Sequence, residues 1–366
     1  MFRKIMTAGS CFVFLIFLTG HAWASCPGYS TAKELGAYAA AQAAEALDAK
    51  WEQGNCIALT NAGYARPDGQ PTLGCLDGVG HTSKTSVGQK SLIRLQSRLD
   101  QPLWFAFYHR DSGRCAYYQL DADQAANVLV GKRDLSPDIF TRQDTARIEA
   151  EYLFTNPEKF QQKSEKGLFG PNLFRVVTAA NAADRKCPDH VLAALQIHDH
   201  YCPGVSSGLL LAAYVQEHIL KSSPQTKCFV LSINPWCKED ALTTLLNATP
   251  GKRAYGVLYP TKEEVKSWPQ PMNRVDTVVF TQEEGGKKWH GWLLGFDFDQ
   301  ARKMQDLPKF DSVVVDKLAA DLWFMDRLDR PEQFVVVHKK VKLGPGESPK
   351  ELLRPGNNPV QILADM

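Results

Sequence analysis

The sequence predicts an α+β protein built from two tandem copies of one domain. Cys-Pro-Gly occurs twice, at Cys26 and at Cys202, and each time it precedes an apolar stretch with helical spacing. Each copy continues with a short strand that starts at a cysteine, a second cysteine near an aspartate, and the alternating segments of a β-hairpin. A repeat of about 100 residues indicates a duplicated domain, because solenoid repeats span only about 20–50 residues.

The motifs of the two copies correspond in order, although Cys75 stands two residues before Asp77 and Cys237 stands three before Asp240. The matching cysteines are Cys26 with Cys202, Cys56 with Cys228, and Cys75 with Cys237. Asp77 and Asp240 follow, and then Thr85, Gly88 and Lys90 in one copy and Thr249, Gly251 and Lys252 in the other. The hairpins turn at Asp111-Ser112-Gly113 and at Gly285-Gly286. We therefore expect helices packed on a mostly antiparallel sheet in each copy, with a pseudo-twofold relation between the copies.

The N-terminal residues have the pattern of a secretory signal. Arg3 and Lys4 precede the apolar run "CFVFLIFLTG", and Ala22-Trp23-Ala24 provides a small-x-small cleavage site. The run is too short to span a bilayer, so we expect a soluble periplasmic or secreted protein without a membrane span. The alternative is a lipoprotein anchored at Cys26. The near balance of 42 basic and 40 acidic residues, without a basic block, argues against a nucleic-acid partner.

These patterns divide the chain into five segments. We expect a signal peptide over 1–24, a first, degenerate domain over 25–130, a helical connection over 131–185, a second domain with the metal site over 186–300, and a C-terminal helix, strand and loose tail over 301–366.

The second copy concentrates metal-binding residue types at two helix starts. His198, His200 and Cys202 lie just before the helix expected over Val205 to Leu220, and Cys237 lies at the next junction between a loop and a helix. Zinc binds cysteine sulfur and histidine nitrogen, and a helix start favours the thiolate form of cysteine. We expect His200, Cys202 and Cys237 to gather, with His198 as a fourth ligand or as a partner of a ligand. Asp240 would orient an imidazole or serve as a base toward a metal-bound water.

The motifs of the second copy resemble a known family. "HDHYCPG" over 198–204, "CKEDA" over 237–241 and "TPGK" over 249–252 are similar to the FmdE-like family, which takes its name from a formylmethanofuran dehydrogenase, over roughly residues 190 to 300. The resemblance implies an α+β fold in which histidine and cysteine side chains meet at a metal-binding cleft, with zinc as the usual metal. It implies no particular reaction, so the sequence leaves open whether the protein is an enzyme.

The first copy departs from this pattern at the positions of the expected histidine ligands. Ala24 occupies the position of His200, and His21 is in a different register. We expect a degenerate partner domain; the alternative is a weaker site that uses Cys26, Cys75 and His81.

Other functions remain open at this point. Cys202 and Cys237 could form a structural disulfide or act as a periplasmic thiol redox pair, and histidine with cysteine near an apolar cleft would also suit another transition metal or haem. Cys56 and Cys228 are expected to be buried, unreactive thiols, whereas the pairing of Cys115 and Cys187 is undecided. The segment that ends in Lys252 lacks the spaced glycines of a phosphate-binding loop, so we do not expect it to bind a nucleotide. The expected partner is a small-molecule or metal-containing ligand, with an internal pseudo-dimer or a homodimer as the assembly.

Overall fold

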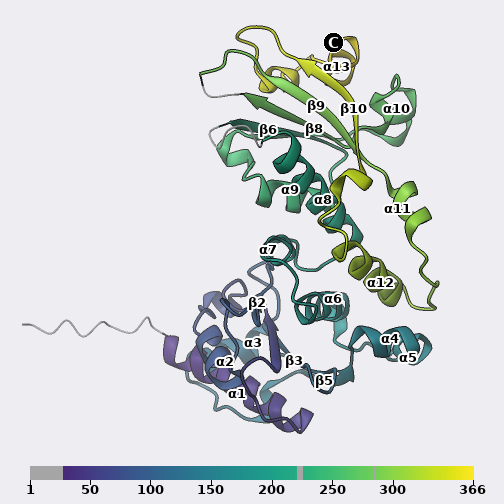
Figure 1. The fold of residues 1–366 in the computed structure, drawn as a ribbon. Helices are drawn as coiled ribbons and strands as arrows, with labels where there is room; N and C mark the ends of the chain where they lie inside the picture. The colour runs from purple at the N-terminus through teal and green to yellow at the C-terminus, as the bar shows by residue number, and fades with distance from the viewer. Residues whose placement is uncertain (1–27, 221–225, 283–284) are drawn as a thin grey trace, which may run out of the picture.

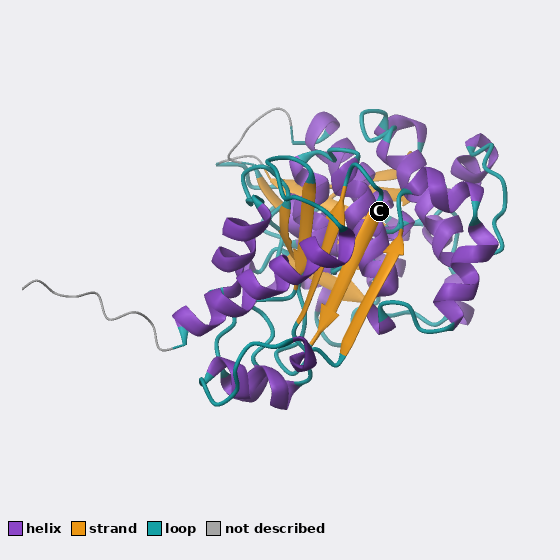
Figure 2. Ribbon diagram, turned by 90° about the horizontal axis from the view of Figure 1, so that it is seen from below, coloured by secondary structure: helices purple, strands orange, loops and turns teal. Residues whose placement is uncertain are grey.

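The two halves of the chain each carry one mixed sheet, so the predicted α+β class is confirmed. The computed structural model describes residues 28–220, 226–282 and 285–366, and the expected signal peptide lies outside them. Figure 1 shows the first half at one end of the molecule and the second half at the other, and Figure 2 shows helices on both sides of the strands.

The first sheet has the strand order β2-β1-β3-β4-β5. Its strands are β1 (Cys56–Thr60), β2 (Leu92–Arg94), β3 (Trp104–His109), β4 (Arg114–Gln119) and β5 (Arg142–Arg147). Only β2 runs parallel to its neighbour, β1, and the other pairs are antiparallel. The hairpin predicted around Ser112 is present as β3 and β4.

The second sheet repeats this connectivity. Its strands are β6 (Lys227–Ile233), β7 (Tyr255–Leu258), β8 (Thr277–Gln282), β9 (His290–Phe296) and β10 (Val335–Lys342). They have the order β7-β6-β8-β9-β10, in which only β7 runs parallel to its neighbour, β6. Both sheets therefore share one pattern of pairing, a parallel edge strand followed by three antiparallel partners.

Strand β5 lies in a segment where the sequence indicated a helix. Its residues alternate in exposure: Gln143, Thr145 and Arg147 are exposed, whereas Arg142 and Asp144 are partly buried and only Ala146 is buried, as suits an edge strand with one face open to solvent. The helical pattern begins later, at α4 (Ala150–Thr155), and continues in α5 (Pro157–Glu165).

Helices cover both faces of each sheet. In the first half, α1 (Tyr29–Leu47), α2 (Cys75–Ser83) and α3 (Ala122–Leu129) bury one face, and α6 (Leu173–Asp184) packs against the other. In the second half the helices are α7 (Asp189–His198), α8 (Pro203–His218), α9 (Lys238–Leu245), α10 (Lys262–Ser267), α11 (Phe298–Met304), α12 (Val313–Met325) and α13 (Pro359–Asp365). α8 and α9 pack on one face of the second sheet, whereas Val360 and Leu363 of α13 are buried on the other, in the segment expected as a loose tail.

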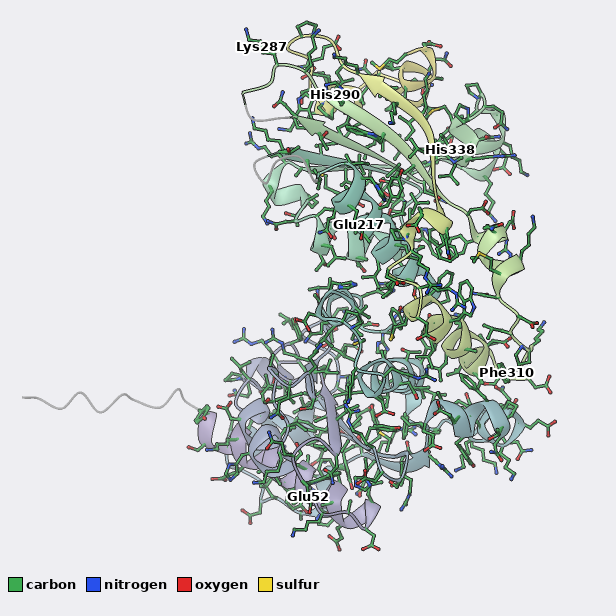
Figure 3. All side chains as sticks on the ribbon, viewed as in Figure 1. Glu52, Glu217, Lys287, His290, Phe310 and His338 are labelled. Atoms are coloured by element: carbon green, nitrogen blue, oxygen red, sulfur yellow. The ribbon has the colours of Figure 1, made fainter. Side chains whose placement is uncertain are left out.

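One hydrophobic core joins the halves. It includes Ile57 of β1, Val177 of α6, Leu209 of α8 and Leu322 of α12. At the edge of this junction, Lys90 pairs with Asp189 at 2.7 Å. The Phe310 ring, labelled in Figure 3, stacks on Phe154 at 5.4 Å. In the described part of the chain, no helix has the length and apolar character needed to cross a membrane.

The starts of α8 and α9 lie unusually close together because glycines remove the side chains between them. A Cβ atom at Gly208 would lie 2.2 Å from the carbonyl oxygen of Lys238. A Cβ atom at Gly204 would lie 2.7 Å from the Cβ atom of Cys237 and 3.2 Å from its sulfur. The backbone contact between the two helices therefore fixes the separation of Cys202, just before α8, from Cys237, just before α9.

We expect Gly208→Ala to destabilise the protein by about 1–3 kcal/mol, because the added methyl group must displace the backbone of α9. Gly251→Ala is the matched control, since a Cβ atom there meets nothing within 4 Å. Urea unfolding of both variants measures the difference; equal free energies of unfolding would contradict the close-packing argument.

Candidate metal centre

Three side chains from three helix ends form a compact group. His198 ends α7, Cys202 precedes α8 and Cys237 precedes α9. Their imidazole nitrogen and two sulfur atoms all lie within 4.8 Å of one another, and Cys202 Sγ is 3.8 Å from His198 Nε2. Cys202 is buried, whereas His198 and Cys237 are half-buried. One nitrogen and two sulfur ligands converge here, so the group could hold a metal ion.

A tight turn between α7 and α8 brings the imidazole to the sulfur atoms. Asp199 has a left-handed backbone conformation with φ 68°, which ends α7 immediately after His198. Tyr201 is fully buried and its amide donates a hydrogen bond to Thr178 Oγ1 at 3.2 Å. Cys202 is extended and Pro203 begins α8, where its missing N–H costs nothing.

His200 lies beside the group and not within it. Its ring centroid is 4.2 Å from that of His198, but its Nδ1 faces Asp199 Oδ1 at 2.7 Å. Asp199 also pairs with Arg175 at 2.9 Å, and the edge of the His200 ring meets Phe174 at 5.1 Å. The sequence predicts His200 with the two cysteines and His198 as a fourth ligand or a partner of a ligand; the structure brings His198 into the group and leaves His200 beside it.

Asp240 orients His198. Its Oδ2 lies 2.6 Å from His198 Nδ1, which leaves Nε2 directed toward Cys202. A carboxylate on the outer nitrogen is the arrangement that fixes the tautomer and the direction of metal-ligating histidines. Asp240 therefore occupies one of the two roles suggested by the sequence, that of orienting an imidazole.

The electrostatics of the group favour an imidazolium next to a thiolate. Burial lowers the pKa of His198, but hydrogen bonds to Asp240 and Cys237 outweigh it and raise this pKa to about 9. A hydrogen bond from Cys202, followed by one from His198, holds the pKa of Cys237 well below its ordinary value. Cys202 bears the opposite shift, since the neighbouring Cys237 and burial both raise its pKa.

The corresponding region of the first half contains no such group among the described residues. Cys75 is fully buried, and burial raises the pKa of its thiol to about 12. Asp77 accepts a hydrogen bond from the Tyr29 hydroxyl at 2.7 Å, where the second half has an imidazole at Asp240. Cys26 lies outside the described residues.

All cysteines that the structure describes are free thiols, including Cys202 and Cys237. Cys115 and Cys187 are buried, and burial raises the pKa of Cys187 to about 11. Cys56 is buried as well, whereas Cys228 is half-buried with a pKa raised by burial to about 12.

Sequence patterns did not reveal four residues around the group. Phe174 and Arg175 come from α6 of the first half, and Trp236 stands just before Cys237. Asp321 of α12 is fully buried, neither of its oxygens has a hydrogen-bond partner among the described residues, and burial raises its pKa well above the usual range. The sequence gives little sign of Asp321, which lies in an apolar helix.

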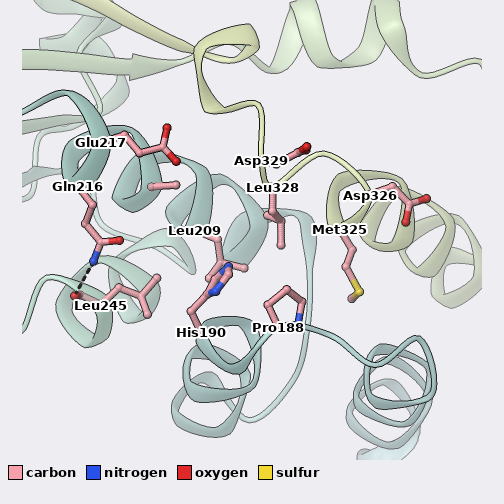
Figure 4. A pocket seen from close by; sticks show the side chains of 11 residues that line it. Pro188, His190, Leu209, Gln216, Glu217, Leu245, Met325, Asp326, Leu328 and Asp329 are labelled. Atoms are coloured by element: carbon pink, nitrogen blue, oxygen red, sulfur yellow. Dashed lines mark hydrogen bonds between the residues drawn. The ribbon is translucent and has the colours of Figure 1, made fainter. Parts of the chain in front are cut away.

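A cavity of about 520 Å³ lies among α7, α8, α9 and α12 (Figure 4). It is separate from the thiol–imidazole group, that is, His198, Cys202 and Cys237. His190, Leu209 and Met325 line it, and Gln216 closes one side by donating to the carbonyl oxygen of Leu245 at 3.3 Å. The cavity shares no lining residue with the group formed by His198, Cys202 and Cys237.

Residues 197–317 match the model of a protein family described as "FmdE, Molybdenum formylmethanofuran dehydrogenase operon". The matched segment contains His198, Cys202, Cys237 and Asp240 and excludes the whole first half. The resemblance inferred from the sequence is therefore confirmed for the second half. No curated protein matches the chain.

In metal-free protein, we expect His198 to titrate near pH 9 and its pKa to fall in Asp240→Asn, because the carboxylate stabilises the imidazolium. Because the pKa of His198 is higher in the folded state than its ordinary value of 6.5, the protonated imidazole stabilises the folded protein. This contribution is fully present below pH 6.5 and is lost as the pH rises through about 9. NMR titration of the ring protons measures the shift. Asp77→Asn is the control, and an equal fall of the His198 pKa in both variants would contradict the assignment.

Proposed function

We propose that the protein binds one zinc ion through His198 Nε2, Cys202 Sγ and Cys237 Sγ, with a fourth position open to water or a ligand. The observation that carries this proposal is the convergence of the three atoms within 4.8 Å. Zinc suits two sulfur ligands and one nitrogen ligand, and three protein ligands plus an exchangeable position are typical of reactive zinc sites.

The surrounding residues support a preorganised site. Asp240 holds His198 by its outer nitrogen, and the starts of α8 and α9 lower the cost of two adjacent thiolates. Metal binding would displace the protons that the group holds in the metal-free state, so zinc affinity should rise with pH. His200 is close enough to the His198 ring to contact a molecule bound at the open position.

We further propose that the two halves arose by duplication and pack as an internal pseudo-dimer. Identical strand connectivity and the ordered series of cysteine motifs support this history. The first half has lost the imidazoles and buries Cys75, yet it supplies Arg175 and Phe174 next to His200. Its role in the proposal is to support the site in the second half.

Export to the periplasm or outside the cell remains part of the proposal. It rests on the positive residues, the short apolar run and the Ala22-Trp23-Ala24 site at the N-terminus.

A thiol redox function is the second candidate. Cys202 and Cys237 are close together, free, and shifted in opposite directions in pKa, as in a pair with one attacking thiolate and one protonated partner. The presence of His198 and of its carboxylate partner favours the metal, because a disulfide needs neither.

We expect wild-type protein to contain about one zinc ion per chain, and His198→Ala, Cys202→Ser and Cys237→Ser each to lose it, because two remaining ligands cannot hold zinc tightly. Cys75→Ser, in the first half, should keep it. Elemental analysis of purified protein measures zinc, and absorption spectroscopy at the zinc edge should show sulfur about 2.3 Å from the metal.

Two results would contradict the zinc site. The first is equal metal loss from Cys75→Ser. The second is metal-free protein, resistant to zinc loading, in which Cys202 and Cys237 form a reversible disulfide; this result would establish the redox candidate.

Protein expressed with its N-terminal segment in an exporting host should begin at or near Ser25, because Ala24 ends the predicted cleavage site. Intact-mass measurement determines the mature end. An acylated Cys26 would instead show that the chain is a lipoprotein.

A further inference from the structure

A large cleft opens in the second half next to the proposed metal centre. It has a volume of about 1150 Å³ and lies between the end of β9, the start of α11 and the middle of β10. Trp236, Arg274, Phe298, Lys303 and His338 are among its lining residues. No residue of the thiol–imidazole group lines it, so the cleft is a separate feature of the surface.

Trp236 is the wall that the cleft shares with the metal centre. The residue directly precedes Cys237, and a Cβ atom at Gly204 would lie 2.9 Å from Trp236 Cζ3 and 3.2 Å from Cys237 Sγ. On the cleft side, the indole ring meets Phe298 with their centroids 5.6 Å apart. About 44% of Trp236 is nevertheless exposed, so a flat aromatic face is presented to whatever enters the cleft.

The charges of the cleft leave cations available. The carboxylates are engaged: Asp276 accepts from the Phe296 amide at 2.7 Å, Asp297 caps α11 through the Gln300 amide, and Asp299 pairs with Arg302. Among residues 28–220, 226–282 and 285–366, neither Arg274 nor Lys303 has an ion-pair partner. The lining thus carries three carboxylates and three cations, and Arg274 and Lys303 are the two cations that no ion pair occupies among the described residues, so they remain available to an anionic ligand group.

A β-bulge places a histidine in the same cleft. The pairing of β9 with β10 shifts register between Val337 and Lys339, which turns His338 toward Gly295. His338 Nε2 lies 2.5 Å from the position that a Cβ atom would take at Gly295, so only glycine leaves space for the ring. Figure 3 labels His338 on β10. Bulges that redirect a side chain are over-represented next to functional sites.

We infer that this cleft binds a planar aromatic carboxylate, with its ring against Trp236 and Phe298 and its carboxylate toward Arg274 and Lys303. The inference deepens the proposed function, because it names the class of ligand held beside the zinc ion. The affinity of the cleft, however, comes from aromatic and cationic residues that are not metal ligands.

Isothermal titration with naphthoate tests the inference, and the neutral naphthylmethanol is the matched probe. Naphthoate should bind at least about tenfold more tightly than the alcohol, because a charge-assisted hydrogen bond to a guanidinium is among the stronger polar contacts. Arg274→Gln should weaken naphthoate binding about tenfold and leave the alcohol unchanged. Arg253→Gln, an exposed arginine outside the cleft, should change neither. Trp236→Ala should weaken both probes, since both carry the ring.

The same titrations on zinc-loaded and metal-free protein separate this inference from the metal site. Binding that depends on Arg274 in both forms supports the cleft, even if the chain proves not to hold zinc. Equal affinity for naphthoate and naphthylmethanol, or equal effects of Arg274→Gln and Arg253→Gln, would overturn the cleft while leaving the zinc measurements intact.

Discussion

The site depends on one packing constraint, the contact between the backbones of α8 and α9. Gly204 and Gly208 remove the side chains that would otherwise separate the two helices. Two helix starts then face the same small volume, and hydrogen bonds from Cys202 and His198 favour negative charge on Cys237. His198 joins them because the left-handed residue Asp199 reverses the chain between α7 and α8. Close packing is thus a condition for the chemistry, because the two cysteines belong to separate sequence motifs and only the contact between α8 and α9 brings their sulfur atoms together.

The first half shows that this packing persists without the chemistry. A Cβ atom at Gly36 of α1 would lie 2.1 Å from the carbonyl oxygen of Cys75, so α1 and α2 also touch backbone to backbone. Yet Cys75 is fully buried and Asp77 is occupied by the Tyr29 hydroxyl. The first half therefore has a similar backbone contact without a ligand group among its described residues, and it contributes to the site through α6, whose Arg175 pairs with Asp199 at the turn.

Features encoded locally were predictable from the sequence, and features set by tertiary contacts were not. The α+β class, the helix after Cys202 and the first hairpin follow from periodicity and turn residues, and each is present. The sequence did not predict strand β5 because its residues are mostly polar and show no apolar alternation. Its pairing with β4 makes it a strand. Which imidazole faces the sulfur atoms depends on the backbone angle at Asp199. Asp321, which is buried and has no hydrogen-bond partner among the described residues, and the cleft beside Trp236 both depend on contacts between segments far apart in the chain.

Charge balance explains why a ligand cleft beside this centre should need its own cations. A zinc ion bound by two thiolates and a neutral imidazole has no net charge, and Asp240 adds a negative charge next to His198. Such a centre offers an open coordination position but little long-range attraction for an anion. Arg274 and Lys303 can supply that attraction from the cleft, on the far side of Trp236. In the proposed arrangement the thiolates and Asp240 would set the reactivity of the metal, whereas the cleft would hold the aromatic carboxylate beside it.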